Sequence, residues 1–219
     1  MKSKYLVPAI FIAVLALSRV PGLLPLDFSP VYAFMFCAGA FFTGSLAWWL
    51  PLATMLGTDL ALNCYYSQKF PDSHVWSGAN LANLGFNYVA YIVMLLLGRG
   101  FGARASWLKL VGGGLVGAML FYLLTNTAAW FFNPYQFPEY TKTLAGWITA
   151  LTKGAGGYPP TWEFFRNTLL SGGLFTALFA AAAKTVAAES PAEKTAGQQA
   201  PEKSDSEAEP AAGTEEASA

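Results

Sequence analysis

Asp59 and Asn63 lie one helical turn apart near the end of an apolar segment, residues 46–66, which has about the length of a membrane-crossing helix. A carboxylate at bilayer depth costs roughly 2.5–3.5 kcal/mol on insertion scales, so such a residue rarely faces lipid. Asp59 is therefore expected to point into a helix bundle or a water-filled cavity. There its carboxylate can neutralise or hydrogen-bond a polar or cationic ligand group. Alternatively it has a structural role and pairs with Arg166 or caps polar backbone groups.

Polar side chains also interrupt three later apolar segments. They are Asn83 and Asn87 early in residues 81–97, Thr125, Asn126 and Trp130 late in residues 108–132, and Arg166 and Asn167 early in residues 164–186. If successive segments cross the bilayer in alternate directions, all these groups reach the same half of the membrane. The other half is almost purely apolar, so the sequence predicts a polar pocket that is closed below by a dry helix bundle.

The predicted ligand-binding residues in this outer-half pocket are Asp59, Asn87, Asn126, Trp130, Arg166 and Asn167. Asparagine amides supply hydrogen-bond donors and acceptors, and Arg166 can bind an acidic ligand group or hold Asp59. Trp130 can stack on a planar ligand, or it can anchor the protein in the membrane interface. Asn63 and Asn83 lie closer to the interface, where polar residues need no ligand to explain them.

The composition identifies the class of protein that positions these residues. Of the 219 residues, 54% are hydrophobic and 12% are charged, whereas soluble domains are usually about 25% charged. The predicted fold is an all-α membrane protein, a six-transmembrane-helix bundle with a short interfacial helix and a disordered C-terminal tail. The predicted spans are residues 5–24, 31–44, 46–66, 81–97, 108–132 and 164–186, and the short helix lies within residues 141–153. Its apolar face comprises Leu144, Trp147, Ile148 and Leu151.

The first apolar segment has a second interpretation. Residues 5–18 follow Lys2 and Lys4 and end on small residues, as in a cleavable signal peptide. We favour an uncleaved helix that runs to about Leu24, because it completes an even number of spans. Both termini then lie on one side of the membrane with most of the cations near the spans, and the positive-inside rule makes that side the cytoplasm. We therefore predict a multi-pass protein of the cell (inner) membrane with cytoplasmic N and C termini.

Charge also divides the chain into two parts. Residues 1–188 contain eleven Lys and Arg against five acidic residues, whereas residues 189–219 contain eight acidic residues against two lysines. The latter stretch is rich in Ala, Glu, Pro and Ser and lacks the apolar content to fold. We predict a six-span transmembrane domain over residues 1–187 and a disordered acidic tail over residues 188–219.

The sequence lacks the residue patterns of common enzyme and cofactor sites. It has one histidine, His74, and two separated cysteines, Cys37 and Cys64, so zinc, iron–sulfur and bis-histidine haem sites lack ligands. No catalytic triad, metalloprotease motif or phosphate loop is present, so we expect no enzymatic activity, cofactor or metal. Basic residues do not cluster with aromatic ones, so nucleic acid is not an expected partner.

Three stretches carry a resemblance to a known family, namely GTDLAL, LTNTAAWFFNPYQFPEYTKTLAG and PTWEFFRNTLLSGGLFTALF. Through them, most of residues 5–186 resembles an uncharacterised six-span bacterial membrane family. In span number and topology it is similar to the S components of energy-coupling-factor transporters. This likeness implies binding of a small organic solute and docking on a transmembrane coupling subunit powered by ATPases. It also implies a docking face of small residues on the first helix, where Ala9 and Ala13 have the required spacing.

The leading functional hypothesis is an S-component-like solute-binding or transport subunit without catalytic activity of its own. Its expected partners are a small organic solute, the lipid bilayer, and a coupling subunit with its ATPases. The alternative is a structural or assembly subunit of a membrane complex, in which the polar layer holds helices together and no ligand binds. An intramembrane enzyme is the third, weaker hypothesis.

Overall fold

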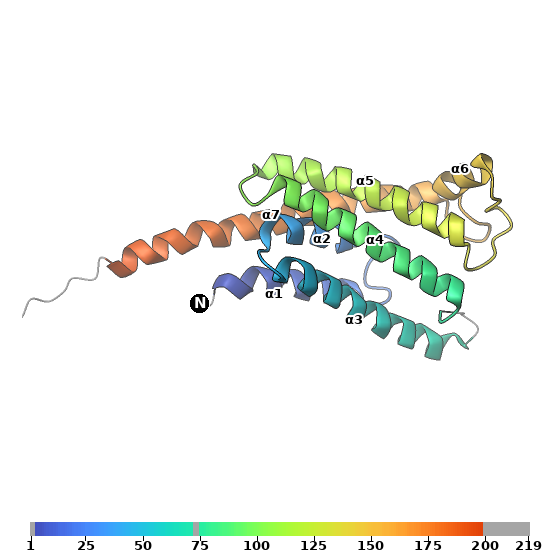
Figure 1. Cartoon of the computed structure of the whole chain (residues 1–219), viewed down its shortest axis with the longest axis horizontal. Coiled ribbons are helices and arrows are strands. Elements are labelled where there is room, and N and C mark those ends of the chain that lie inside the picture. Colours follow the sequence, from blue (N-terminus) through green and yellow to red (C-terminus); the bar gives the residue numbers. More distant parts are fainter. Residues whose placement is uncertain (1–2, 72–74, 199–219) are drawn as a thin grey trace, which may run out of the picture.

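The computed structural model describes the backbone of residues 3–71 and 75–198, which forms helices joined by loops, without strands. The helices are α1 (Ser3–Ser18), α2 (Val31–Phe41), α3 (Leu46–Lys69), α4 (Gly78–Phe101), α5 (Trp107–Phe132), α6 (Leu144–Thr152) and α7 (Thr161–Gln198). Apart from the short α6, successive helices run in alternate directions along one bundle (Figure 1). The expectation of an all-helical protein with a short helix before the last long one is confirmed.

The expected six spans are not all present as long apolar helices. Among the described residues, three helices are long and apolar enough to cross a membrane: α4, α5 and the Thr161–Ala187 part of α7. α1 and α2 have only 16 and 11 residues, and a perpendicular crossing needs about 20. α3 has 24 residues but carries polar ones, among them Asp59 and Asn63. α1 also ends at Ser18 instead of Leu24, because turns follow from Arg19 onward.

α2 lies at the centre of the bundle, in contact with α1, α3, α4, α5 and α7. Ten of its eleven residues are buried, so longer helices enclose a helix that is apolar on all sides. α2 meets α4 at backbone distance, because a Cβ atom on Gly39 would overlap Leu95 O and one on Gly98 would overlap Phe36 O. These two glycines, one in each helix, therefore allow close helix packing.

Apolar side chains also cover the outside of the bundle. Exposed ones on the long helices include Leu56, Leu60, Val89, Ile92, Leu96, Val116, Met119, Leu120, Leu123, Leu170, Leu174 and Leu178. Soluble monomers rarely expose so extensive an apolar surface, which a bilayer would cover. α3 contributes Leu56 and Leu60 to this surface while Asp59, on the same helix, is buried.

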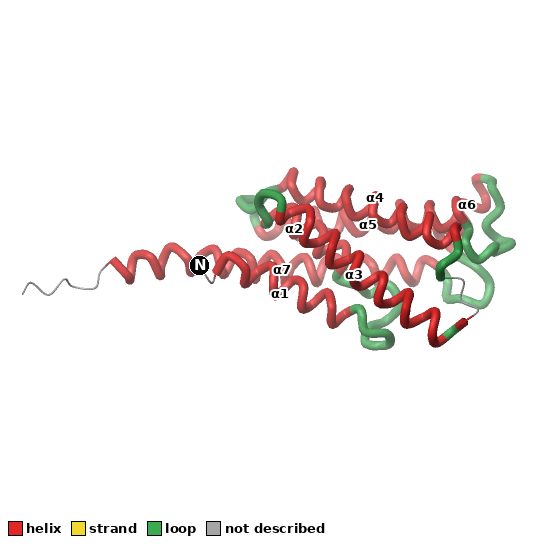
Figure 2. The backbone as a smooth tube through the Cα atoms, turned by 60° about the horizontal axis from the view of Figure 1, so that its bottom comes forward, coloured by secondary structure: helices red, strands yellow, loops and turns green. Residues whose placement is uncertain are grey.

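The two ends of the bundle differ. α1 begins and α7 leaves the bundle at one end, whereas α6 and the two loops that flank it lie at the other, the α6 end, as Figure 2 also shows. α6 packs on α5, where Trp147 Nε1 donates a hydrogen bond to Thr127 Oγ1 at 2.9 Å. Leu144 and Ile148 of its predicted apolar face are exposed and extend the outer apolar surface.

α7 continues to Gln198. The predicted boundary between the bundle at residue 187 and a disordered tail from residue 188 therefore falls inside this helix. The sequence before the boundary is rich in alanine, the residue with the highest helix propensity, which favours continuation of the helix. The remainder of the predicted tail, residues 199–219, lies outside the described residues.

Candidate functional site

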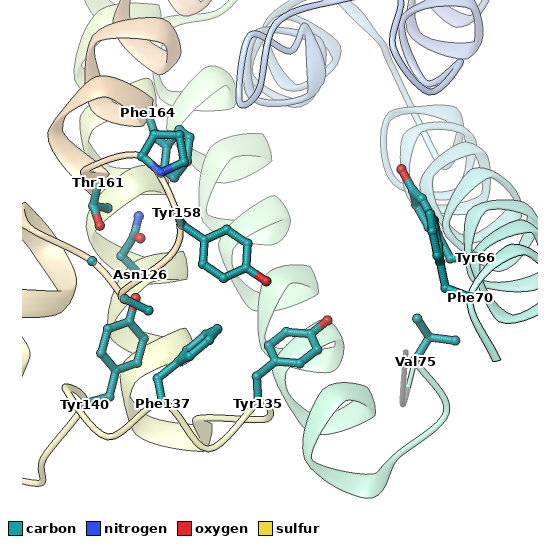
Figure 3. Close-up of a pocket in the computed structure, with 13 residues that line it drawn as sticks. Tyr66, Phe70, Val75, Asn126, Tyr135, Phe137, Tyr140, Tyr158, Thr161 and Phe164 are labelled. Atoms are coloured by element: carbon teal, nitrogen blue, oxygen red, sulfur yellow. The ribbon is translucent and has the colours of Figure 1, made fainter. Parts of the chain in front are cut away.

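A cavity with a volume of about 780 Å³ lies at the α6 end. Its lining is mostly aromatic: Tyr66, Phe70, Tyr135, Phe137, Tyr140, Tyr158 and Phe164. Figure 3 shows the hydroxyl groups of Tyr135 and Tyr158 directed across the cavity toward Tyr66 and Phe70. Besides the tyrosines, its polar lining side chains are those of Asn126 and Thr161. We call it the aromatic cavity.

Asn133 fixes the loop that carries three of these rings. It follows the last residue of α5 in a left-handed conformation, with φ 39°, which asparagine tolerates better than most residues. Its side chain accepts a hydrogen bond from Phe137 N at 2.9 Å and donates one to Phe137 O at 3.0 Å. The Phe137 ring contacts those of Tyr135, Tyr140 and Tyr158 at centroid distances of 5.5 to 5.8 Å. The loop sequence thus positions a connected cluster of rings.

A second cavity, of about 280 Å³, adjoins the aromatic one and shares Tyr66, Val75 and Tyr135 with it. We call it the amide chamber, because four asparagines line it. Its polar lining side chains other than tyrosines are those of Arg19, Asp59, Asn63, Asn80, Asn83 and Asn87.

A third cavity, the inner chamber, has a volume of about 240 Å³. It shares Asn126 with the aromatic cavity, and Arg19, Asn87 and Tyr91 with the amide chamber. Because they share lining residues, the three cavities adjoin one another, and we call them together the cavity system, with an aromatic part and a polar part.

Arg19 and Asp59 form an ion pair in the wall of the amide chamber. Asp59 is 5% exposed, and Tyr88 donates a hydrogen bond to its second carboxylate oxygen at 3.0 Å. Arg166, which one of the alternatives paired with Asp59, is exposed and lies over the Trp162 ring, 5.8 Å from its centroid. That alternative was wrong because the segment after α1 brings Arg19 to Asp59. The charges in the amide chamber therefore compensate each other.

Four buried polar atoms of this chamber lack a hydrogen-bond partner in the described structure: Arg19 Nε, Asn63 Nδ2, Asn83 Oδ1 and Asn87 Oδ1. Among the described residues, Glu139 and Thr176 each have one further buried polar atom without a partner. An unsatisfied buried group costs about 1–3 kcal/mol, and most such groups in proteins pair with protein or water. The wall of the amide chamber therefore offers donors and acceptors to whatever fills it.

Three of the six predicted ligand-binding residues, Asp59, Asn87 and Asn126, line the cavity system. The other three line none of its cavities. Trp130 Nε1 donates to Thr141 O at 2.7 Å, and Asn167 Nδ2 donates to Leu26 O at 3.0 Å, so both side chains fasten loops. Arg166 is exposed and lies over the Trp162 ring.

Sequence reasoning missed Arg19 and the aromatic loop, and it assigned Asn63 and Asn83 to the membrane interface. A signal for Arg19 was present, because it is the one cation between Lys4 and Lys69. A signal for the loop was present too, because five of residues 131–140 are aromatic. Aromatic residues are also common at membrane interfaces, and sequence alone does not show which rings face a cavity.

The loop tyrosines are neutral hydrogen-bonding groups. Burial raises the pKa of the Tyr135 and Tyr140 hydroxyls, with smaller contributions from Tyr158 and Glu139 respectively. Both phenols therefore stay protonated at physiological pH. Within the described part of the chain, no three His, Cys, Asp or Glu side chains lie together as metal ligands would. The cavity system offers ring faces, hydroxyls, amides and one ion pair.

Comparison with known proteins gives one match. Residues 1–194 match the model of a family described as "Family of unknown function (DUF6580)". No curated protein and no solved structure matches the chain, and nothing in the comparisons supports the likeness to S components of energy-coupling-factor transporters. Because the match covers most of the chain, the protein belongs to the family of unknown function DUF6580.

Proposed function

We propose that the protein is an integral membrane subunit that binds a small organic solute in the cavity system at the α6 end. Asp59, Asn87 and Asn126 are contact residues in this proposal, together with Arg19 and the aromatic loop. The protein performs no reaction on the solute. Its contribution is a preformed cavity that joins ring faces to hydrogen-bonding groups, as small-molecule sites usually do.

The observation that carries the proposal is the set of four unpaired polar atoms in the amide chamber. Amides that hold helices together would bond to one another or to backbone across helices. Here Asn63, Asn83 and Asn87 each present to one cavity a buried atom that has no hydrogen-bond partner among the described residues. A solute with matching donors and acceptors can pair with these atoms.

The proposal places the α6 end outside the cell membrane and both termini in the cytoplasm. It is supported by the alternate directions of the helices (Figure 1) and by the cations at the opposite end. Arg99 and Arg104 lie there, and Lys184 Nζ is 3.5 Å from Ala103 O of the same connection. This charge distribution fits the positive-inside rule. The short helices α1 and α2 would then cross with the help of adjoining loops and local bilayer thinning.

Transport of the solute would require a partner, because the sequence has no nucleotide-binding motif. We propose a transmembrane coupling subunit with ATPases in this role, as in S-component systems. Ala9, Ala13 and Ala16 are exposed on α1, and small residues of this kind allow close helix contact in membranes.

A structural or assembly subunit is the second candidate. The observation in its favour is the Arg19–Asp59 ion pair, which ties the segment after α1 to α3. In that case the polar layer would stabilise the fold and no solute would bind.

Mass spectrometry of small molecules retained through purification in mild detergent tests the proposal, with wild type beside Asn87→Leu and Asn167→Leu. The two variants form a matched pair. Asn87 lines the cavity system with an unpaired amide oxygen, whereas Asn167 lines none of its cavities and donates to Leu26 O. We expect Asn87→Leu to lose the retained molecule at undiminished ligand-free stability, because leucine has a similar shape and no unpaired group.

Asn167→Leu is expected to show the opposite pattern, with the molecule retained and stability lowered by roughly 0.5–1.5 kcal/mol. If wild type retains no molecule and Asn87→Leu is the less stable variant, the amides are structural. The second candidate then replaces the first.

A further inference from the structure

We propose that the solute is an uncharged molecule with a planar aromatic or heteroaromatic ring whose edge carries amide-type donors and acceptors. The inference rests on the proposed function and names the chemical class of its ligand. The ring would lie in the aromatic cavity. Its polar edge would reach the amide chamber where the two cavities adjoin, beside their shared lining residues Tyr66, Val75 and Tyr135.

The aromatic cavity favours a flat ring over a flexible alkyl chain. Its rings come from four separate segments: the end of α3, the loop after α5, the loop after α6 and the start of α7. Tyr135 and Tyr158 face Tyr66 and Phe70 across the space (Figure 3). A planar guest between such walls gains stacked or edge-to-face contacts beyond the burial of its area.

The charges of the cavity system favour an uncharged guest. Among the described residues, no ionisable acid or base lines the aromatic cavity apart from tyrosines, and in the amide chamber Arg19 is already paired with Asp59. Asp27, the remaining acid of the cavity system, lines the inner chamber and is exposed. A charged solute would leave water without a free counter-charge in the two larger cavities, which is unfavourable.

The unpaired atoms of the amide chamber indicate which hydrogen-bonding groups the edge of the ligand must carry. Arg19 Nε and Asn63 Nδ2 are donors, whereas Asn83 Oδ1 and Asn87 Oδ1 are acceptors. A guest that satisfies both kinds must itself carry an acceptor and a donor. A carboxamide or a ring lactam has this combination in one plane, whereas a carboxylate has acceptors only.

Three probes of the same framework test the inference: 2-naphthamide, its carboxylate twin 2-naphthoate, and its saturated twin decahydronaphthalene-2-carboxamide. Affinities are measured by titration calorimetry on the purified full-length protein in detergent. We expect 2-naphthamide to bind at least about tenfold more tightly than either twin, because each twin lacks one of the two matched features.

Two variants test whether the expected preference for 2-naphthamide arises from contacts in the aromatic cavity and the amide chamber. Phe137→Leu is expected to reduce the preference for 2-naphthamide over the saturated twin, and Asn87→Leu the preference over the carboxylate. Phe131→Leu is the control, because Phe131 is exposed and lines none of the described cavities.

The outcomes separate the ligand class from the proposed function. If either twin binds as tightly as 2-naphthamide, or if none of the probes binds up to millimolar concentration, the ligand class is overturned. Tight binding of the saturated twin would indicate a lipid or detergent chain in the aromatic cavity. A retained molecule that is charged or lacks a planar ring also overturns the class, although solute binding then stands. The proposed function fails only if wild type also retains no molecule through purification.

Discussion

Arg19, the first residue after α1, and Asp59, in the second half of α3, form an ion pair that also supports one wall of the amide chamber. The two helices they join have few other contacts with each other. A charge pair that is mostly buried is therefore both a tie between peripheral helices and part of the candidate binding site.

Removal of either partner is expected to destabilise the protein. Asp59→Asn leaves the Arg19 guanidinium without its carboxylate, and loss of one partner of a buried pair typically costs about 3–5 kcal/mol. The double variant Arg19→Gln/Asp59→Asn is expected to recover a large part of this loss, because no uncompensated charge remains. The free energies of unfolding of the wild type, both single variants and the double variant provide the measurement. Strictly additive effects would show that the pair does not interact in the folded protein.

Gly98→Ala is expected to disrupt the contact between α4 and α2, because the new methyl group would overlap the Phe36 carbonyl oxygen. Backbone cannot yield as a flexible side chain can, so we expect a loss of roughly 1–3 kcal/mol or more. Gly100→Ala is the matched control, since a Cβ atom there has nothing within 4 Å. Alanine in this helical position should be neutral or stabilising. Thermal unfolding of both variants checks the expectation, and equal midpoints would contradict it.

Asn133→Gly is expected to loosen the aromatic loop without changing its backbone course. Glycine adopts a positive φ freely but loses both hydrogen bonds to Phe137, each of which contributes about 0.5–1.5 kcal/mol. Amide hydrogen exchange of residues 134–140 should therefore accelerate.

Asn133→Asp should have an intermediate effect, because its carboxylate can still accept from Phe137 N. Unchanged exchange in both variants would show that the side chain of Asn133 does not hold the loop.

The proposed orientation of the protein in the membrane can be tested by labelling variants with a single accessible cysteine. Cys64→Ser removes the exposed thiol, whereas Cys37 is fully buried and can stay. In that background, Gln136→Cys at the α6 end should react with a membrane-impermeant maleimide on intact cells. Arg104→Cys, an exposed position at the opposite end, should react only after permeabilisation. The reverse pattern would invert the topology, and reaction of both on intact cells would rule out a sealed six-pass arrangement.

The sequence by itself determined the class of the protein and most helix positions. Low charge and long apolar segments identified a helical membrane protein, because bilayer burial requires internally bonded backbone and apolar side chains. α4, α5 and α6 lie within a few residues of their predicted ranges. The sequence also predicted that Asp59, Asn87 and Asn126 line a pocket, because polar residues in apolar segments need an interior partner or a cavity.

Tertiary structure decided which of these residues meet. The periodicity of apolar residues does not show whether a helix spans the membrane or is enclosed by other helices. Only the packing shows that α2 is an enclosed core helix. Sequence separation does not fix ion pairs, and Asp59 joined Arg19, 40 positions away, instead of Arg166. The aromatic cavity depends on rings from four segments that approach only when α3, α5 and α7 are packed. Such long-range contacts follow from the mutual arrangement of helices, which local patterns of side chains do not encode individually.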